Sequence, residues 1–319
     1  MDTSLDKPKN PPLAGVYVKG IAMGAADIVP GVSGGTIAFI TGIYQQLIDS
    51  IGSMGPKSVS ILVKEGPVAA WNSFNGTFLA VLMAGIFTSV FTLSKLIAHL
   101  LATQPQLLWS FFFGLILVSA WHIGRQIGDW SVSTVMSLVL GVAVAYGITM
   151  VSPSEIPLSP VTLFMAGAVA ICAMVLPGIS GSFILLLMGM YSHVIHAVKN
   201  LELVNLAVFA LGCGLGILGF TRLLSWLLHR YLSLTLALLT GFMLGSLNKI
   251  WPWKQTLTTR VNSHGETVPV HQVNVSPEQF LALTGQDPQL GFSIVLMLSA
   301  IFLVLCMEWV SARKAANGS

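Results

Sequence analysis

The chain has 319 residues, of which 54% are hydrophobic and only 8% are charged, and its formal net charge is +3. Soluble domains carry about 25% charged residues, so this composition excludes a soluble globular protein and indicates a polytopic membrane protein. The small net charge gives no reason to expect a nucleic-acid partner. The first residues are polar and contain no apolar segment, so we expect no cleavable signal peptide.

Ten apolar segments follow one another along the chain, and a membrane-spanning helix needs about 20 such residues. They occupy residues 13–28, 32–49, 77–100, 107–123, 131–151, 161–176, 180–196, 204–228, 233–249 and 290–310. The first two segments flank a Pro-Gly dipeptide, and so do the sixth and the seventh. These four segments are short for a full crossing, so we predict that each pair forms a re-entrant helical hairpin. A pair of shortened spans is the alternative.

The two Pro-Gly dipeptides belong to a repeated motif. The stretch ADIVPGVSGG at 26–35 returns 147 positions later as AMVLPGISGS at 173–182, with nine identities over the 23 aligned positions that start at residue 26. A weaker similarity continues in the following segments, where Gly85 corresponds to Gly212. In lipid, irregular backbone persists only where protein or a water-filled cavity surrounds it. A break at corresponding positions of two halves is therefore typical of a transporter's binding site.

Each half thus consists of a re-entrant hairpin followed by three transmembrane helices. Because three crossings reverse the direction of the chain, the halves insert with opposite orientations, as inverted-topology repeats. We predict an all-α polytopic membrane protein with a first repeat at 13–152 and a second at 161–310. The remaining parts are a cytoplasmic N-terminal tail at 1–12, an extracytoplasmic loop at 251–290 and a cytoplasmic C-terminal tail at 311–319. The alternating run 267–275 predicts a small hairpin or lid in this loop; a passive solvated loop is the alternative.

The basic residues support this orientation. With both termini in the cytoplasm, ten of them lie on the cytoplasmic side and five outside, which agrees with the positive-inside rule. The cytoplasmic ten are Lys7, Lys9, Lys19, Lys57, Lys64, Arg125, Arg222, Arg230, Arg313 and Lys314, and the outer five are Lys95, Lys199, Lys249, Lys254 and Arg260. This distribution supports a multi-pass protein with both termini in the cytoplasm and six full spans.

Small and hydroxyl-bearing residues follow both Pro-Gly dipeptides. Glycine lets the backbone approach a ligand closely, and the first turn of a helix presents unpaired amides and the positive end of its dipole to an anion. We predict that the two breaks meet near the membrane midplane and bind a phosphate or another small oxyanion. Close helix packing through small residues is the alternative interpretation. The predicted phosphate-binding residues are Gly31, Ser33, Gly34, Gly35, Thr36, Gly178, Ser180, Gly181 and Ser182.

Asp27 directly precedes the first break, at the position where the second copy has Met174. An acid at membrane depth is costly and is a functional hypothesis by default. Asp27 could take up and release a proton or hold a cation during transport, and it could equally pair with a lysine or cap backbone amides. Its charge would repel a phosphate, so we favour a coupling role over direct contact with substrate.

Lys95 and Arg222 occupy equivalent positions in the two halves. Basic pockets between spans bind lipid head groups, so both residues are candidates for attracting one. Snorkelling of the side chains toward the membrane surface is the alternative. His193 and His196 are not accompanied by acids or cysteines at ligand spacing, so we predict no metal site. We also expect no catalytic residue and no cofactor.

The stretch DIVPGVSGGTIAFITGIY at 27–44 resembles the DUF368 family of bacterial membrane proteins. The second copy, LPGISGSFILLLMGMY at 176–191, is also similar to that family, and the resemblance covers about 13–310. Members of this family are implicated as polyprenyl-phosphate transporters. They return undecaprenyl phosphate, the C55 carrier lipid of cell-wall synthesis, from the outer to the inner leaflet of the cytoplasmic membrane. The resemblance implies a flippase rather than an enzyme, with this lipid and the bilayer as its partners.

Two other functions stay open. A transporter or channel for a small inorganic anion would use the same helix ends. A phosphatase of lipid pyrophosphates is the third hypothesis, because membrane undecaprenyl-pyrophosphate phosphatases also have inverted repeats and a Pro-Gly-x-Ser motif. In those phosphatases an Arg-Ser pair follows the motif. Here the corresponding residues are Gly34-Gly35 and Gly181-Ser182, and the glutamates do not cluster, which argues against hydrolysis. The sequence leaves open the coupling ion and whether the chain forms a homo-oligomer.

Overall fold

The computed structural model describes residues 12–29, 31–151, 156–261 and 267–317. The helices of the first half are α1 (Leu13–Ile28), α2 (Gly34–Ile40), α3 (Tyr44–Gly52), α4 (Pro56–Glu65), α5 (Pro67–Ser73), α6 (Gly76–Thr103), α7 (Pro105–Gly124) and α8 (Val132–Met150). The second half contains α9 (Pro160–Val175), α10 (Gly181–Leu187), α11 (Tyr191–Lys199), α12 (Leu203–Arg230), α13 (Leu232–Ser246), β1 (Lys254–Val261), β2 (Thr267–Asn274), α14 (Pro277–Thr284) and α15 (Leu290–Asn317). The fold is therefore almost wholly helical, as predicted.

Five of the described helices are long and apolar enough to cross a membrane: α6, α7, α8, α12 and the part Leu290–Trp309 of α15. The chain is thus a multi-pass helical membrane protein. The sixth predicted span, 233–249, forms α13, which has only 15 residues. Most of α13 is buried, and it packs against α7 and α8. Because protein rather than lipid surrounds it, α13 does not have to match the thickness of the bilayer.

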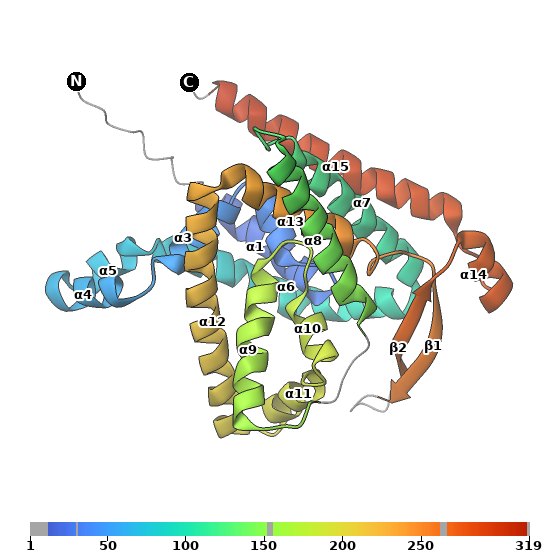
Figure 1. The fold of residues 1–319 in the computed structure, drawn as a ribbon, viewed down its shortest axis with the longest axis horizontal. Helices are drawn as coiled ribbons and strands as arrows, with labels where there is room; N and C mark the ends of the chain where they lie inside the picture. The colour runs from blue at the N-terminus through green and yellow to red at the C-terminus, as the bar shows by residue number, and fades with distance from the viewer. Residues whose placement is uncertain (1–11, 30, 152–155, 262–266, 318–319) are drawn as a thin grey trace.

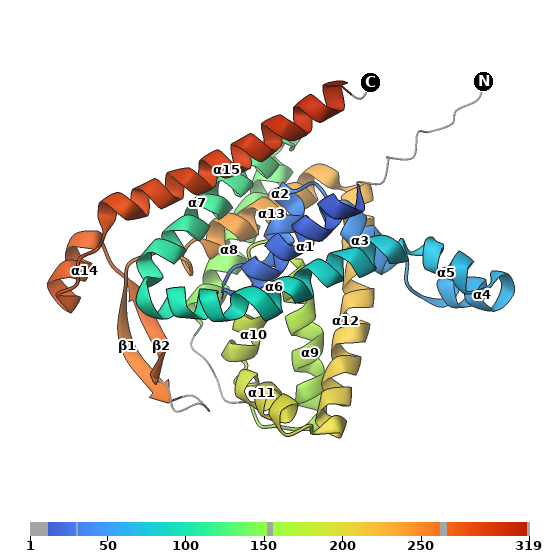
Figure 2. The same ribbon diagram turned by 180° about the vertical axis from the view of Figure 1, so that it is seen from behind.

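The two halves pack in the same way. Helix α1 runs along α6, and its counterpart α9 runs along α12 (Figures 1 and 2). Helix α7 packs against α15, and α13, the counterpart of α7, packs against α8. The individual contacts repeat as well, because Gly85 lies against the carbonyl of Tyr17 and Gly212 lies against the carbonyl of Phe164. The sequence repeat relates these residues pairwise, so both halves use the same order of helices and the same close contact.

Helix α12 offers a matched test of this packing. A Cβ atom added at Gly212 would overlap the carbonyl of Phe164, whereas one added at Gly214 would meet nothing within 4 Å. Both positions lie inside the same helix, so a valine changes helix propensity equally at the two sites. We expect Gly212→Val to destabilise the protein by about 1–3 kcal/mol through overpacking and Gly214→Val to have a much smaller effect. Thermal unfolding of the purified protein in detergent measures this difference, and equal shifts would contradict the close contact of α9 with α12.

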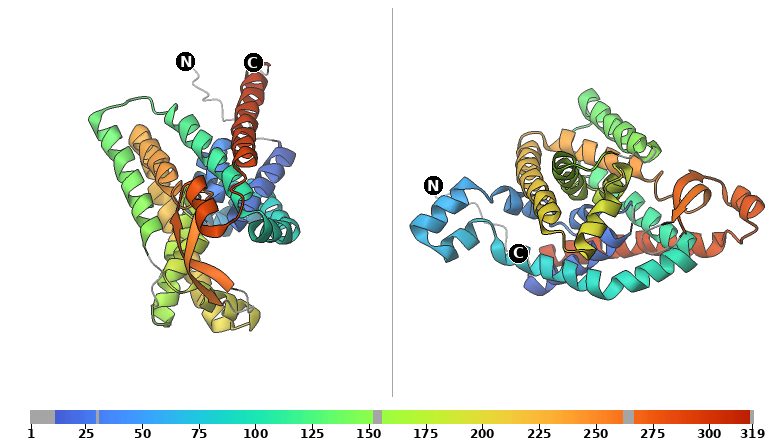
Figure 3. Two further views of the ribbon diagram at one scale, coloured as in Figure 1. Left: turned by 90° about the vertical axis from the view of Figure 1, so that its right-hand side faces the viewer. Right: turned by 90° about the horizontal axis from the view of Figure 1, so that it is seen from below.

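The segment 251–290 forms the predicted hairpin, with β1 and β2 antiparallel, followed by α14. Trp251 Nε1 donates a hydrogen bond to the Val275 carbonyl at 2.9 Å, and Trp253 Nε1 donates one to the Pro288 carbonyl at 2.8 Å. These bonds fasten the hairpin where it joins the helices. The hairpin and α14 lie at one end of the molecule, and α4 and α5 extend from the opposite end (Figures 1 and 3).

Some predicted features fall outside the described residues. They are residues 1–11 of the N-terminal tail, Pro30 of the first motif, residue 152 at the end of the first repeat, residues 262–266 of the extracytoplasmic loop and residues 318–319 of the C-terminal tail. The rest of the predicted C-terminal tail, up to Asn317, continues helix α15.

Candidate functional site

Both predicted breaks are present and have the same backbone conformation. Gly31 lies between α1 and α2 with φ 90°, and Gly178 lies between α9 and α10 with φ 85°. Residues that carry a Cβ atom rarely adopt a positive φ, which explains why each motif has a glycine at this position. A second turn follows each short helix at Gly42 (φ 70°) and Gly189 (φ 69°), and α11 is bent by 107° from α10. Each motif therefore interrupts an apolar segment with a short helix between two turns.

The two breaks touch each other across the halves of the molecule. Ser33 Oγ lies 3.0 Å from the carbonyl of Leu176 and 3.2 Å from the carbonyl of Met174, within donating distance of both. In the opposite direction, the Gly178 amide donates to Thr36 Oγ1 at 3.0 Å. Ser33 and Thr36 are both 0% exposed. The predicted meeting of the breaks is confirmed, and the hydroxyls of the first copy serve to join them.

Tyr44 adds a contact that the sequence did not assign to the site. Its buried hydroxyl donates to the carbonyl of Val175 at 3.2 Å. The same carbonyl lies 2.6 Å from the place that a Cβ atom on Gly35 would occupy. Tyr44 is one of the nine identities between the motifs, as the partner of Tyr191. The identity with Tyr191 was therefore the sequence feature that could have pointed to this contact. Tyr191 itself is exposed and makes no equivalent bond to the first break among the described residues.

In the first copy, protein groups already satisfy the amides at the start of α2. Asp27 Oδ1 accepts a hydrogen bond from the Gly34 amide at 2.7 Å. Ser33 Oγ accepts a hydrogen bond from the Gly35 amide at 3.1 Å. Asp27 therefore caps this helix, which was one of the roles open to it from the sequence. A phosphate at this helix end would have to displace a carboxylate.

The second copy is arranged differently. Met174 replaces Asp27, so no carboxylate faces the start of α10, and no side chain of the described residues caps this helix. The hydroxyls of Ser180 and Ser182 lie 2.9 Å apart and hydrogen-bond to each other. Their mutual bond uses one O–H group, which leaves the other free to donate. The second break is thus the better placed of the two to receive an anion.

A lysine lies beside both breaks. Lys249 is in the turn after α13, and its Nζ lies 4.4 Å from the ring centroid of Phe183 in α10. Its Cγ lies 3.0 Å from the position of a Cβ atom on Gly31. The positive-inside rule predicts that Lys249 lies outside the membrane, and no sequence motif assigns it to the site. The sequence feature that could have pointed to Lys249 is its position as the last residue of the apolar segment 233–249, next to the long loop.

Arg222 and Lys95 lie elsewhere. The guanidinium of Arg222 donates from Nε to the carbonyl of Gly52 at 3.1 Å and from a second nitrogen to the carbonyl of Met54. Arg222 therefore binds the carbonyl end of α3, as basic residues often do at helix C-termini. Lys95 is an exposed residue of α6. Attraction of a head group stays a prediction for both residues.

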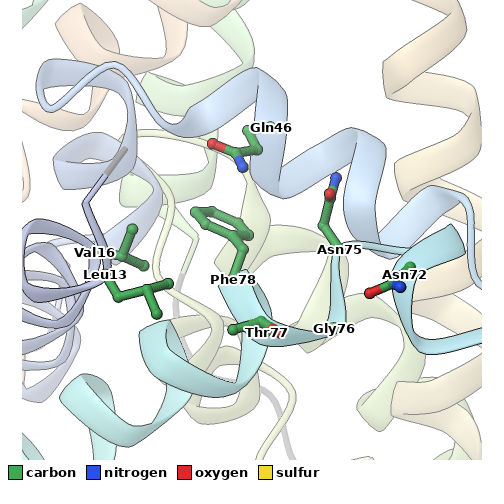
Figure 4. Close-up of a pocket in the computed structure, with 8 residues that line it drawn as sticks. All are labelled: Leu13, Val16, Gln46, Asn72, Asn75, Gly76, Thr77 and Phe78. Atoms are coloured by element: carbon green, nitrogen blue, oxygen red, sulfur yellow. The ribbon is translucent and has the colours of Figure 1, made fainter. Parts of the chain in front are cut away.

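One cavity, of about 280 Å³, lies at the start of α6 (Figure 4). Its lining combines three amide side chains with small and apolar groups: Leu13, Val16, Gln46, Asn72, Asn75, Gly76, Thr77 and Phe78. None of these residues carries a charge, so no side chain in this lining offers a positive charge to a phosphate group. Among the described residues, no group of three or more His, Cys, Asp and Glu could hold a metal ion.

Comparison with known proteins identifies the family. The profile of the VCA0040-like family, described as undecaprenyl phosphate translocase-like, matches residues 23–268. The chain is 54% identical over 292 residues to the polyprenyl-phosphate transporter of Vibrio cholerae, covering 92% of this chain and 95% of the relative. It is 34% identical over 254 residues to the polyprenyl-phosphate transporter of Staphylococcus aureus, covering 74% of this chain and 85% of the relative. No solved structure gives a significant match. The chain therefore belongs to the VCA0040-like family of undecaprenyl phosphate translocase-like proteins.

Proposed function

We propose that this protein translocates undecaprenyl phosphate from the outer to the inner leaflet of the bacterial cytoplasmic membrane, so that the carrier lipid can be reused in cell-envelope synthesis. The observation that carries the proposal is the 54% identity, over nearly the whole chain, to a protein named polyprenyl-phosphate transporter. The relatives are named as transporters rather than as enzymes. The second break supplies a physical site for the head group, because one O–H of the Ser180–Ser182 pair remains free to donate and Lys249 lies close by.

The head group would bind at the start of α10. There the free hydroxyl of the Ser180–Ser182 pair can donate to a phosphate oxygen, and Lys249 supplies a positive charge close by. The isoprenoid tail would stay in the lipid beside the exposed apolar faces of the outer helices. Only the small polar head group then has to pass through the protein.

The contact between the breaks would act as the closed gate of this path. Ser33 and Thr36 are fully buried in it, so a head group can cross only after the two breaks separate. The equivalent packing of α1 with α6 and of α9 with α12 supports a rocking motion of two inverted repeats.

In this proposal both termini lie in the cytoplasm, and the hairpin of β1 and β2 lies outside. Protonation of Asp27 couples the motion to the proton gradient.

Intact cells test the proposed function. Undecaprenyl phosphate labelled in the outer leaflet would be followed in bacteria that lack their own transporters of this lipid, with and without the protein. We expect the protein to lower the amount of labelled lipid in the outer leaflet, and equal amounts in the two strains would contradict the proposal. Release of inorganic phosphate from a lipid pyrophosphate by the purified protein would instead indicate a phosphatase.

The serine pair provides a variant of this test. We expect the double replacement Ser180→Ala and Ser182→Ala to lower the rate of transport by about tenfold or more, because a hydrogen bond to a charged group contributes about 1.5–3 kcal/mol. Ser299→Ala is the matched control, since Ser299 is an exposed residue of α15 whose hydroxyl bonds only to its own helix. Equal rates in the two variants would show that the serine pair does not bind the head group.

A further inference from the structure

Two lysines meet where the hairpin joins the helices. Lys254, at the start of β1, donates a hydrogen bond from its Nζ to the carbonyl of Lys249. The same Nζ lies 4.4 Å from the ring centroid of Trp109 in α7. Lys249 in turn covers Phe183 of α10 and packs on Gly31 of the first break. The pair therefore connects the hairpin, α7 and both breaks.

Neither lysine has an acidic partner in the part of the chain that the structure describes. The ion pairs found among the described residues join His122 to Glu308, His196 to Glu202 and His229 to Asp49, and none of them includes Lys249 or Lys254. Both side chains are half-buried. Two like charges that share a partly buried place without a counter-ion are costly, so an anion bound beside them would stabilise this arrangement.

The pKa of Lys254 reflects its burial and its nearness to Lys249. Burial, and secondly the positive charge of Lys249, lower the pKa of Lys254 from 10.5 to about 7. An opposite charge favours the charged form of a group and a like charge disfavours it. A bound phosphate would therefore favour the protonated form of Lys254.

The place is rigid. Asn274 of β2, which pairs with Lys254 in the sheet, donates from its Nδ2 to the carbonyl of Asn248 at 2.7 Å. Trp251, next in the chain after the turn that carries Lys249, packs edge-on against Trp253 and Phe113. Lys254 is thus held by a fixed scaffold of strands and aromatic rings, as a preorganised anion site requires.

We propose that Lys249 and Lys254 together form the cationic part of the phosphate site, and that the hairpin of β1 and β2 serves to hold the second cation over the breaks. This inference rests on the proposed function for the nature of the lipid. It makes the start of β1, where Lys254 lies, part of the binding site and not of a passive loop. It also assigns the selectivity for a phosphate over a neutral polyprenol to these two charges, with the hydroxyls of the second break as additional donors.

Binding can be measured apart from transport. The probe is farnesyl phosphate, added to the full-length protein in lipid nanodiscs, and tryptophan fluorescence is the readout because Lys254 lies on the ring of Trp109. We expect Lys249→Gln and Lys254→Gln each to raise the Kd by about tenfold or more. Lys249→Arg and Lys254→Arg, which keep the charge, should retain most of the affinity. Lys64→Gln is the matched control, since Lys64 is an exposed residue of α4.

Each outcome decides the proposal. An unchanged Kd in both glutamine variants would overturn it, and so would equal binding of farnesol, which lacks the phosphate. A purely anchoring role for the lysines predicts lower thermal stability of the glutamine variants with an unchanged Kd. Inorganic phosphate that binds as tightly as farnesyl phosphate would identify a site for the free anion. If the lysines control binding but the wild-type protein moves no lipid in cells, the proposed function fails while this site stands.

Discussion

A valine at position 35 is expected to abolish transport while the protein still inserts into the membrane. A Cβ atom at Gly35 would lie 2.6 Å from the carbonyl oxygen of Val175, in the contact between the two breaks. That carbonyl belongs to the backbone and cannot turn aside, so the breaks must shift apart. The closed contact between the breaks could then not form, and alternating access needs a closed state on each side. A misplacement of about 1 Å at a precisely positioned site can lower a rate by about 100-fold, and we expect a loss of this order.

The control for this variant is Gly147→Val. Gly147 is an exposed residue of α8, and an added Cβ atom meets nothing within 4 Å. The measurement is the disappearance of labelled undecaprenyl phosphate from the outer leaflet, normalised to the amount of protein in the membrane. Equal transport by Gly35→Val and Gly147→Val would mean that the contact between the breaks has no part in the passage of the head group.

Replacement of Asp27 by asparagine is expected to separate a capping role from a coupling role. The Asp27 carboxylate accepts a hydrogen bond from the Gly34 amide at 2.7 Å. The side-chain oxygen of an asparagine can accept the same bond, but an amide cannot take up or release a proton. We therefore expect Asp27→Asn to keep nearly the stability of the wild type and to lose any stimulation of transport by an imposed proton gradient.

Asp27→Ala completes the comparison. It removes the acceptor as well as the charge, so it should lower stability by about 1 kcal/mol, as the loss of a helix cap does. Transport into proteoliposomes with and without a pH gradient, together with thermal unfolding, measures the two effects. Coupling by Asp27 is excluded if Asp27→Asn responds to the gradient as the wild type does, or if the wild type does not respond at all.

The helices could be predicted closely from hydropathy. The apolar segment 77–100 corresponds to α6 and 204–228 corresponds to α12, because only a helix satisfies its own backbone in lipid. Helices α4 and α5, in contrast, lie between residues 49 and 77, where hydropathy predicts no apolar segment. They are short and not strongly apolar, and their start signals were the prolines Pro56 and Pro67 at the first helical position.

The site could be predicted only in part. The repeat located both breaks and implied that they are equivalent. The structure shows that they differ, because Asp27 caps one helix and Met174 cannot cap the other. Lys249 reaches the breaks through the turn after α13, a tertiary contact that no local pattern encodes. Arg222 likewise has its partners in α3 and the turn that follows, which its place in the repeat did not indicate.

The most direct test is an experimental structure of the protein with farnesyl phosphate bound. We predict that the phosphate lies at the start of α10, within hydrogen-bonding distance of the Ser180–Ser182 pair and in contact with Lys249. A phosphate bound instead in the cavity lined by Asn72 and Asn75, or beside Lys95, would contradict the account.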